Sequence, residues 1–359
     1  MPGAPAIMAA MSTNLYFVYP GDLDAATGGY HYDRRLISEL LDMGLQVHPV
    51  ALPQCSLAME NNSRQQVRER LAAIPDQAVV IVDGLALGVL DEEAQAEAKR
   101  LRLIALCHHP LALESGLDEA QQRALFDSEK RALESVRVTL VTSDNTRRIL
   151  VDDYSVPDDC ITVAVPGVDK QTFAACTGDP PRLLTVATLT QRKAHDVLID
   201  ALAGLVELGW QARFVGGDHF DPDWVQQLRQ RAANAGLRER IEFAGSVPDI
   251  FPEYLEADVF VLPSRFEGYG MVFAEALAAG LPIIAARAGA VPDLVPEKAS
   301  LLVPPDDASA LGDAIRRLLT QEGLRQQLQD GAREVASTLP NWQDSAKKVF
   351  ELVMGVNQS

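Results

Sequence analysis

The sequence predicts an α/β protein made of two Rossmann-like domains, each built around a parallel β-sheet. The chain has 359 residues, which is long for a single hydrophobic core. Short apolar runs alternate with longer amphipathic stretches along most of its length, as in doubly wound domains. These runs form two series, and a stretch without periodicity separates them. Together the three observations favour two domains of the same architecture.

The apolar runs are short and rich in β-branched residues, which is typical of strands buried on both faces of a parallel sheet. In the first series the predicted strands span residues 15–19, 47–51, 79–82, 103–106, 138–142 and 161–165. In the second series they span residues 183–187, 212–215, 241–244, 259–262, 283–285 and 301–303. The stretches between them predict helices with one buried face, as the spacing of Leu36, Ile37 and Leu40 illustrates.

The domain boundaries follow from the two series. We expect an N-terminal domain over residues 1–170 and a C-terminal domain over residues 183–340. Residues 171–182 contain a Gly-Asp-Pro-Pro sequence and no periodic pattern, which indicates a linker. Residues 341–359 are expected to form a terminal helix.

Composition indicates an acidic globular protein. The formal net charge is −18, so the chain lacks the basic surface that binding to a nucleic acid requires. No apolar stretch reaches the roughly 18 residues of a transmembrane helix, and residues 1–12 lack the basic and apolar regions of a secretory signal. The four cysteines are widely spaced, which is typical of reduced thiols. We therefore expect a cytoplasmic protein, with contact to a membrane surface left open and the oligomeric state unknown.

Two glutamates eight positions apart, Glu267 and Glu275, flank a glycine-containing turn between a predicted strand and a predicted helix. Gly268 and Gly270 in the turn permit positive φ and let a ligand approach the backbone. The amides of the first helical turn, with the helix dipole behind them, are suited to bind phosphate. The two carboxylates are suited to accept hydrogen bonds from sugar and ribose hydroxyls. The layout therefore fits a sugar nucleotide.

This turn resembles the E-x(7)-E signature of the retaining family 4 glycosyltransferases. The matching residues are Glu267, Gly268, Gly270, Glu275, Ala276, Ala278, Gly280 and Pro282. The resemblance implies the GT-B fold, in which two Rossmann-like domains with parallel sheets face each other across a cleft. It also implies an acceptor-binding N-terminal domain, a nucleotide-sugar-binding C-terminal domain, and a terminal helix that returns to the first domain.

Two features of the first domain resemble the same family. Gly28 and Gly29 follow the first predicted strand, where the family has a glycine pair that approaches the donor diphosphate and sugar. His109, directly before a proline, matches the family histidine that contacts the donor sugar. A tight turn and a packed histidine are the alternative interpretations. A metal site at His108 and His109 lacks a third ligand nearby in the sequence, and the glycine pair lacks the rest of a nicotinamide-binding G-x-G-x-x-G.

The loop after the first strand of the second domain resembles the family loop at the donor phosphates, and Lys193 falls on the family lysine. Ala187 and Ala194 replace glycines of the pattern, and Thr188 replaces a phosphate-binding arginine. Arg192 is our candidate for the missing cation, with a solvent-facing side chain as the alternative. Lysine and arginine stabilise the charge that builds on a departing nucleoside diphosphate.

The run 243–247 resembles the family FxGxV, in which backbone groups, here at Val247, pair with the nucleobase. Because the backbone contacts the base, the side chains do not identify it. We prefer UDP because it is the commonest donor nucleotide of the family.

The resemblance implies a retaining, metal-independent transfer of a sugar, preferably a hexose, from a UDP-sugar to a hydroxyl of a soluble small molecule or saccharide. In this family the leaving phosphate accepts the proton of the acceptor. The predicted catalytic residues are His109, Lys193 and Glu267. The predicted donor-binding residues are Gly28, Gly29, Arg192, Lys193, Val247, Glu267, Gly268, Tyr269, Gly270, Met271, Val272 and Glu275. No cofactor is expected.

The acceptor is the least determined part of the prediction, because in this fold it is set by variable loops of the first domain, here residues 54–66 and 111–118. A lipid acceptor is one alternative. A nucleotide-sugar epimerase of the same fold and a non-catalytic nucleotide-sugar-binding protein are two others. An epimerase would turn over without an acceptor, and a binding protein would not turn over at all.

Overall fold

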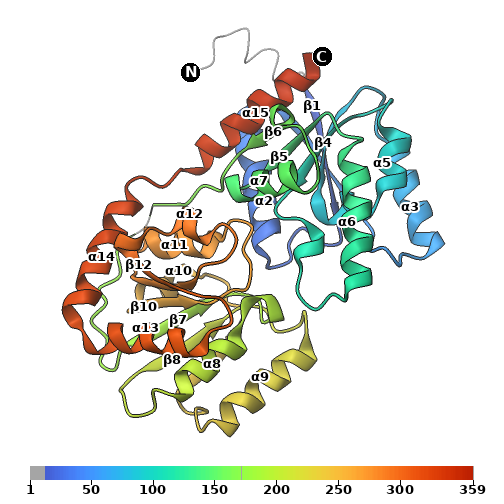
Figure 1. Cartoon of the computed structure of the whole chain (residues 1–359). Coiled ribbons are helices and arrows are strands. Elements are labelled where there is room, and N and C mark those ends of the chain that lie inside the picture. The colour runs from blue at the N-terminus through green and yellow to red at the C-terminus, as the bar shows by residue number, and fades with distance from the viewer. Residues whose placement is uncertain (1–12, 171, 359) are drawn as a thin grey trace. The chain divides into compact units, whose positions relative to one another are not determined.

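The computed structural model describes residues 13–170 and 172–358, and the chain folds as two compact units. Unit 1 comprises the chain up to Gly167 together with the stretch from Trp342 onward, and unit 2 comprises Val168–Asn341. Figure 1 shows the elements of each unit along the chain. Residues 1–12, in which we looked for a secretory signal, and residue 171, the first of the predicted linker, lie outside the described residues.

Unit 1 contains a six-stranded sheet of order β2-β1-β3-β4-β5-β6, in which all neighbouring strands are parallel. Its strands are β1 (Asn14–Pro20), β2 (Gln46–Leu52), β3 (Val79–Asp83), β4 (Arg102–Cys107), β5 (Val138–Val141) and β6 (Ile161–Val163). In this sheet β2 lies on one side of β1, and β3 and the later strands lie on the other side. The carboxyl ends of β1 and β3 therefore mark a topological switch point, where ligands of open α/β sheets bind.

The helices of unit 1 are α2 (Gly28–Asp42), α3 (Asn61–Ala72), α4 (Gly84–Leu87), α5 (Asp91–Glu97), α6 (Glu119–Leu133), α7 (Asp144–Asp152) and α15 (Trp342–Gln358), with 3-10 turns η1 (Leu111–Leu113) and η2 (Asp158–Cys160). The hydroxyl of Thr27 caps α2 by accepting a hydrogen bond from the Tyr30 amide at 3.3 Å. Helix α15, from the end of the chain, packs against α2 and contacts β3 and β6 (Figure 1).

Unit 2 contains a second six-stranded parallel sheet, of order β12-β11-β10-β7-β8-β9. Its strands are β7 (Arg182–Val186), β8 (Gln211–Val215), β9 (Ile241–Gly245), β10 (Val259–Leu262), β11 (Ile283–Ala286) and β12 (Ser300–Val303). This is the strand order of a dinucleotide-binding Rossmann fold, and its switch point lies between β7 and β10. Two parallel sheets in an α/β chain confirm the predicted fold class.

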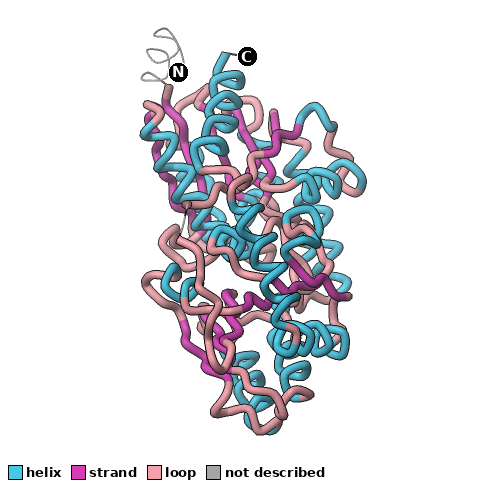
Figure 2. Tube along the Cα trace, turned by 90° about the vertical axis from the view of Figure 1, so that its left-hand side faces the viewer, coloured by secondary structure: helices cyan, strands magenta, loops and turns pink. Residues whose placement is uncertain are grey.

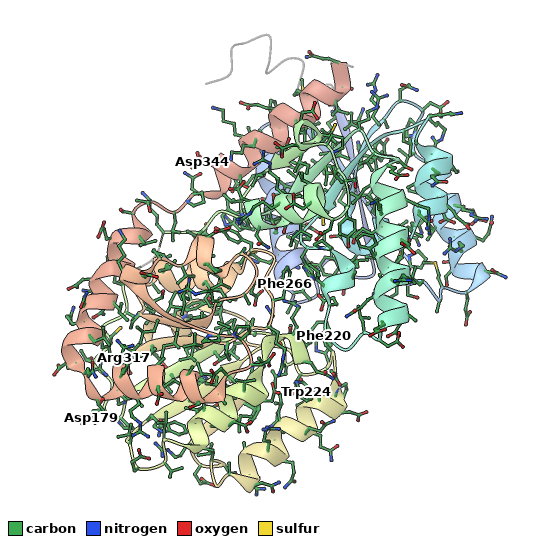
Figure 3. The ribbon with its side chains drawn as sticks, in the orientation of Figure 1. Asp179, Phe220, Trp224, Phe266, Arg317 and Asp344 are labelled. Atoms are coloured by element: carbon green, nitrogen blue, oxygen red, sulfur yellow. The ribbon has the colours of Figure 1, made fainter. Side chains whose placement is uncertain are left out.

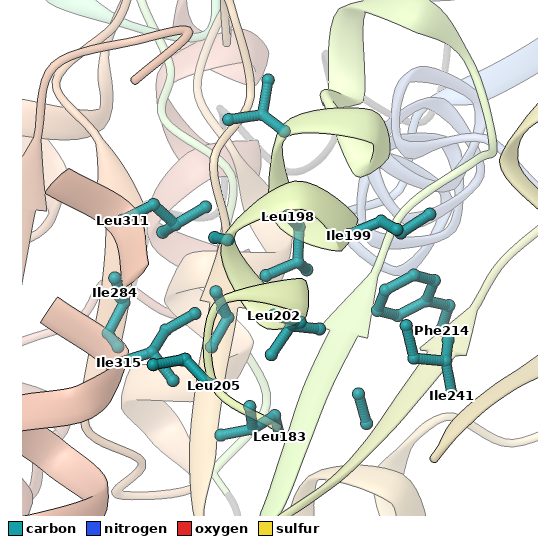
Figure 4. Packing of buried hydrophobic residues seen from close by; sticks show 14 of the residues in the cluster. Leu183, Leu198, Ile199, Leu202, Leu205, Phe214, Ile241, Ile284, Leu311 and Ile315 are labelled. Atoms are coloured by element: carbon teal, nitrogen blue, oxygen red, sulfur yellow. The ribbon is translucent and has the colours of Figure 1, made fainter. Parts of the chain in front are cut away.

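The helices of unit 2 are α8 (His195–Ala203), α9 (Pro222–Asn234), α10 (Phe251–Leu255), α11 (Met271–Ala278), α12 (Val291–Leu294), α13 (Ala308–Thr320) and α14 (Glu322–Ala336), with 3-10 turns η3 (Gln191–Lys193) and η4 (Glu297–Ala299). Figure 2 shows the helices in cyan and the strands in magenta along the trace. Leu198 and Leu202 of α8 pack with Ile315 of α13 and with Phe214 and Ile284 of the sheet (Figure 4). These apolar contacts hold the strand ends of unit 2 in place.

The described part of the predicted linker, residues 172–182, belongs to unit 2. The Ala174 amide donates to the Ala279 carbonyl at 2.8 Å. Buried Asp258 accepts from the amides of Gly178 and Arg182, at 2.8 and 2.7 Å. Among the residues that the structure describes, no helix is long and apolar enough to cross a membrane.

Candidate functional site

The candidate site lies at the switch point of unit 2. Strands β7 and β10 are parallel neighbours, so the turns that follow them emerge at the same edge of the sheet. The turn after β7 carries Lys193, and the turn after β10 carries Glu267. Figure 3 labels Phe266, the residue before Glu267, in the second of these turns. Residues 74 positions apart in the sequence are thereby brought into direct contact.

Glu267 is buried and held by two cations. Its Oε1 lies 2.7 Å from Lys193 Nζ, and its Oε2 lies 3.5 Å from Arg192 Nη1. The same Arg192 nitrogen donates to the Phe266 carbonyl at 3.0 Å. The Arg265 amide donates to the Arg192 carbonyl at 2.8 Å, which ties the two turns together through their backbones. The structure places the Arg192 side chain beside Lys193 and Glu267, not facing the solvent.

The charge state of Glu267 follows from these contacts. Burial alone would raise the pKa of this carboxyl, but the nearby charges of Lys193 and Arg192 outweigh burial and hold the pKa below its usual value. Glu267 is therefore ionised at neutral pH. The cluster has one buried anion and two cations, so its net charge of about +1 favours an anionic ligand.

Within the described residues, no side-chain hydrogen bond caps the start of α11, the helix that follows the turn after β10. Gly270 precedes the helix with φ +89°, and a Cβ on it would lie 2.7 Å from the ring of Phe273. The Glu267 carbonyl accepts from the Ala290 amide at 2.9 Å. A Cβ on Gly289 would lie 2.2 Å from that carbonyl oxygen, so only glycine fits there. Gly268, Tyr269, Met271 and Val272, all predicted to bind the donor, lie in this turn or in the first turn of α11.

Glu275 lies one turn further into α11, in a different environment. The hydroxyl of Tyr254, a fully buried residue of α10, donates to Glu275 Oε2 at 2.7 Å. Burial raises the pKa of Glu275, while the hydrogen bond from Tyr254 lowers it, and the net direction is upward. The structure therefore separates the two glutamates of the signature into one with a lowered pKa and one with a raised pKa.

In the turn after β7, an alanine takes the place of a family glycine but keeps the conformation that glycine favours. Ala194 has φ +53° and ψ +38°, the left-handed region, although it is an alanine. Next to it His195 is fully buried, and its ring packs edge-on against Phe214 at 5.3 Å. Burial and the charge of Lys193 lower the pKa of His195 to about 4, so this histidine is neutral and serves packing. Val247 is half-buried and packs against the core of unit 2.

The remaining predicted residues lie in unit 1. Gly28 and Gly29 form the first turn of α2, directly after the capping Thr27. His109 follows β4, and its Nε2 lies 2.6 Å from Glu114 Oε1. These positions are at the carboxyl ends of β1 and β4, and their roles toward a donor stay predictions.

A buried cluster in unit 1 was missed by the sequence reasoning. His108 Nε2 lies 3.2 Å from Asp33 Oδ1 and 3.6 Å from Asp83 Oδ2, and both aspartates are fully buried. Burial alone would lower the pKa of His108, but the two carboxylates raise it to about 10. The aspartates come from α2 and from the end of β3, so no spacing in the sequence links them to the histidine. Asp83 at the end of a strand and His108 after the next strand were partial signals, but nothing local places Asp33 beside them.

Comparison with known proteins finds a family match for the part of the chain that contains Lys193 and Glu267. Residues 180–321 match the family model described as glycosyl transferases group 1. The chain is 28% identical over 245 residues to mannosylfructose-phosphate synthase of Agrobacterium fabrum, and the match covers 62% of this chain and 53% of that protein. The chain thus spans about half the length of this curated relative.

Two solved structures share the fold. Sucrose-phosphate synthase from Thermosynechococcus elongatus has a TM-score of 0.79 and 22% identity, covering 96% of this chain and 99% of that one. Anabaena HepE in complex with UDP and glucose has a TM-score of 0.75 and 17% identity, covering 94% and 99%. The fold of the chain is therefore GT-B, as predicted.

Proposed function

Because this chain carries a domain of the glycosyl transferases group 1 family on a GT-B fold, we propose that it is a retaining glycosyltransferase. It transfers a hexose from a UDP-sugar to a hydroxyl of a soluble small molecule or saccharide. The observation that carries the proposal is the contact of Lys193 and Arg192 with Glu267, beside the start of α11.

The donor diphosphate has a suitable binding place in this geometry. The eight-residue helix α11 starts directly after Gly270, which has no side chain that could cover the amides of the first helical turn. Lys193 and Arg192 supply positive charge at the neighbouring turn. Since a departing nucleoside diphosphate gains negative charge, these cations stabilise the transition state more than the bound donor.

The two glutamates divide the recognition of the donor. Glu267, ionised and fixed by Lys193, accepts hydrogen bonds from hydroxyls of the donor sugar. Glu275, one turn along α11 and oriented by Tyr254, accepts from the ribose hydroxyls. The leaving phosphate takes the proton of the acceptor hydroxyl on the face from which it departs, which accounts for retention without a covalent enzyme intermediate.

The choice of substrates is supported by the similar proteins. The HepE structure contains UDP and glucose, which favours UDP as the donor nucleotide. The names of the mannosylfructose-phosphate and sucrose-phosphate synthases describe products made of small sugars, which favours a soluble carbohydrate acceptor over a lipid.

A thermal-shift panel with UDP, GDP, ADP and NAD, with and without EDTA, tests the donor assignment. A ligand that binds only the folded protein raises its melting temperature. We expect UDP to give the largest shift, the shift to survive EDTA, and Glu275→Ala to lose it. Exposed Glu297, also in unit 2, provides the matched control, and Glu297→Ala should keep the full UDP shift.

Turnover is tested by release of UDP from UDP-glucose in the presence of hexoses and hexose phosphates. We expect release to depend on an acceptor and the product to keep the anomeric configuration of the donor, as read from the NMR coupling of the anomeric proton. Release of a second UDP-sugar without acceptor would show an epimerase instead. A shift with NAD alone would remove the proposal altogether.

A further inference from the structure

The buried cluster of unit 1 offers a second candidate site, formed by residues of unit 1 alone. Asp83 ends β3, His108 follows β4, and Asp33 lies on α2, which follows β1. All three therefore lie near the carboxyl edge of the sheet of unit 1, at its switch point between β1 and β3. One ligand atom from each lies within 4.8 Å of the other two.

The cluster has more acceptors than donors. Within residues 13–170 and 172–358, Asp33 Oδ2 and Asp83 Oδ2 are buried and accept no hydrogen bond. A single imidazole N–H cannot point at two carboxylates at once, and His108 Nε2 faces both. Two fully buried carboxylates without sufficient donors are costly unless a cation joins them. Even with His108 protonated, two buried carboxylate oxygens therefore remain for a metal ion to bind.

The spacing of the atoms matches that of ligands around one small cation. In a tetrahedral zinc site with ligand distances near 2.1 Å, neighbouring ligand atoms are about 3.4 Å apart. The distances from His108 Nε2 to the two carboxylate oxygens are 3.2 and 3.6 Å. We propose that Asp33, Asp83 and His108 bind a divalent transition metal ion, with Zn²⁺ as the best match to one imidazole nitrogen and two carboxylates.

The surroundings fix these ligands in place. The other oxygen of Asp83 accepts from the Leu85 amide at 2.8 Å, and the His108 carbonyl accepts from the hydroxyls of Thr142 and Thr146, each at 3.3 Å. Such outer contacts orient metal ligands. A Cβ on Gly29 would lie 3.3 Å from the His108 ring, so the glycine keeps this side uncrowded.

One of the three proposed ligands is partly exposed. The His108 side chain is 18% exposed, whereas the aspartates are at most 1% exposed. Three protein ligands leave one coordination position of a tetrahedral Zn²⁺ for water or another ligand, unlike the four protein ligands of closed structural sites. The proposed site therefore takes a metal that can hold an oxygen of a small molecule. It stands independently of the transferase assignment, because all its ligands belong to unit 1.

Zinc titration of the EDTA-treated full chain tests the proposal without any variant. We expect saturable binding of one Zn²⁺ per chain by calorimetry, with release of a proton where Zn²⁺ replaces it on His108. The Co²⁺ form is expected to show visible absorption bands of tetrahedral intensity. Binding that fails to saturate, or that saturates only at millimolar Zn²⁺, would overturn the proposal.

Two substitutions locate the ion. Asp33→Asn keeps the shape of the side chain and His108→Gln keeps a polar group, and each is expected to weaken Zn²⁺ binding at least tenfold. His48→Gln is the matched control in the same unit, because His48 is exposed and contacts Asn14; it should bind as the unchanged chain does. Undiminished binding in folded Asp33→Asn would place the ion elsewhere and contradict the proposal.

Discussion

At the scale of single residues, the two signature glutamates have opposite electrostatic roles. Glu267 sits between two cations, and its pKa is lowered. Glu275 accepts a hydrogen bond from the Tyr254 hydroxyl, and burial raises its pKa. A group with a lowered pKa stabilises the fold above its unfolded pKa, and a carboxyl with a raised pKa stabilises it below that value. The sequence motif therefore contains one glutamate that supports folding at neutral pH and one that opposes it.

Substituting each glutamate by glutamine should separate these effects. At pH 7, Glu267→Gln is expected to lower the free energy of unfolding of unit 2 by about 3 kcal/mol, because it breaks a buried ion pair. Part of this loss should disappear as the pH falls below about 4.3, the unfolded pKa, because the unfolded carboxyl is then protonated first and the native one only at lower pH. Glu275→Gln should raise stability at pH 7 and have little effect near pH 4, while weakening UDP binding.

Urea titrations followed by hydrogen exchange of peptides from β10 and α11 measure these changes in unit 2 alone. Glu297→Gln serves as the control, since Glu297 is 87% exposed and pairs only loosely with Arg287. If Glu275→Gln destabilised the chain at pH 7, the raised pKa of Glu275 would be wrong.

At the scale of elements, the turns after β7 and β10 both need a residue with positive φ. Gly270 meets this need at φ +89°, and Ala194 meets it at φ +53° with a Cβ in place. An L-residue in the left-handed region costs roughly 1–2 kcal/mol. The turn after β7 therefore carries backbone strain at the residue directly following Lys193.

Exchanging alanine and glycine at these turns should give opposite results. Gly270→Ala is expected to cost about 2 kcal/mol or more, since strain adds to the close approach to Phe273. Ala194→Gly is expected to leave the free energy of unfolding unchanged or raise it by up to about 1 kcal/mol, because relief of strain offsets the flexibility of glycine. Urea unfolding of the unchanged protein, Gly270→Ala and Ala194→Gly measures both changes in the free energy of unfolding.

Gly323→Ala is the matched control for these turns. Gly323 lies in α14, has no positive φ, and would meet nothing within 4 Å of an added Cβ. It should change stability by less than about 1 kcal/mol. A loss above about 1 kcal/mol for Ala194→Gly would show that Ala194 is not strained.

The elements themselves were largely predictable, and the contacts between them were not. All twelve predicted strands overlap strands of the structure, because buried parallel strands leave apolar runs with little ambiguity. The Glu267 turn could be found through its glycines and its two carboxylates, and the Lys193 turn through its resemblance to the family loop. The Asp33–Asp83–His108 cluster could not, because its members meet only through the order of β1, β3 and β4. Strand order depends on packing that no local pattern records.

At the scale of the whole molecule, unit 1 is discontinuous in sequence. Helix α15 contributes Trp342, Val349 and Val353 to its interior, each at most 4% exposed. Burying side chains of this size contributes roughly 1.5–3 kcal/mol each. Because a domain is stable by only about 5–15 kcal/mol, the last helix holds a large share of the stability of unit 1.

Ending the chain after Asn341 should therefore unfold unit 1 and leave unit 2 folded. Unit 2 spans Val168–Asn341 without a break and has its own core. Hydrogen exchange with mass spectrometry is the measurement. Peptides from β1 and β3 should lose protection, and peptides from β7 and β10 should keep it.

Glu351→Ala in the full chain is the control, because Glu351 is exposed on α15 and its replacement leaves the apolar face intact. Protection of β1 and β3 should then equal that of the unchanged chain. Retained protection of β1 in the shortened chain would show that unit 1 is stable without its last helix.

The position of α15 also orders events during synthesis on the ribosome. Unit 2 is complete in the nascent chain while unit 1 still lacks the helix that covers α2. Unit 1 must therefore keep one face of α2 uncovered until α15 leaves the exit tunnel. Of the two units, the one whose strands are translated earlier therefore finishes folding later.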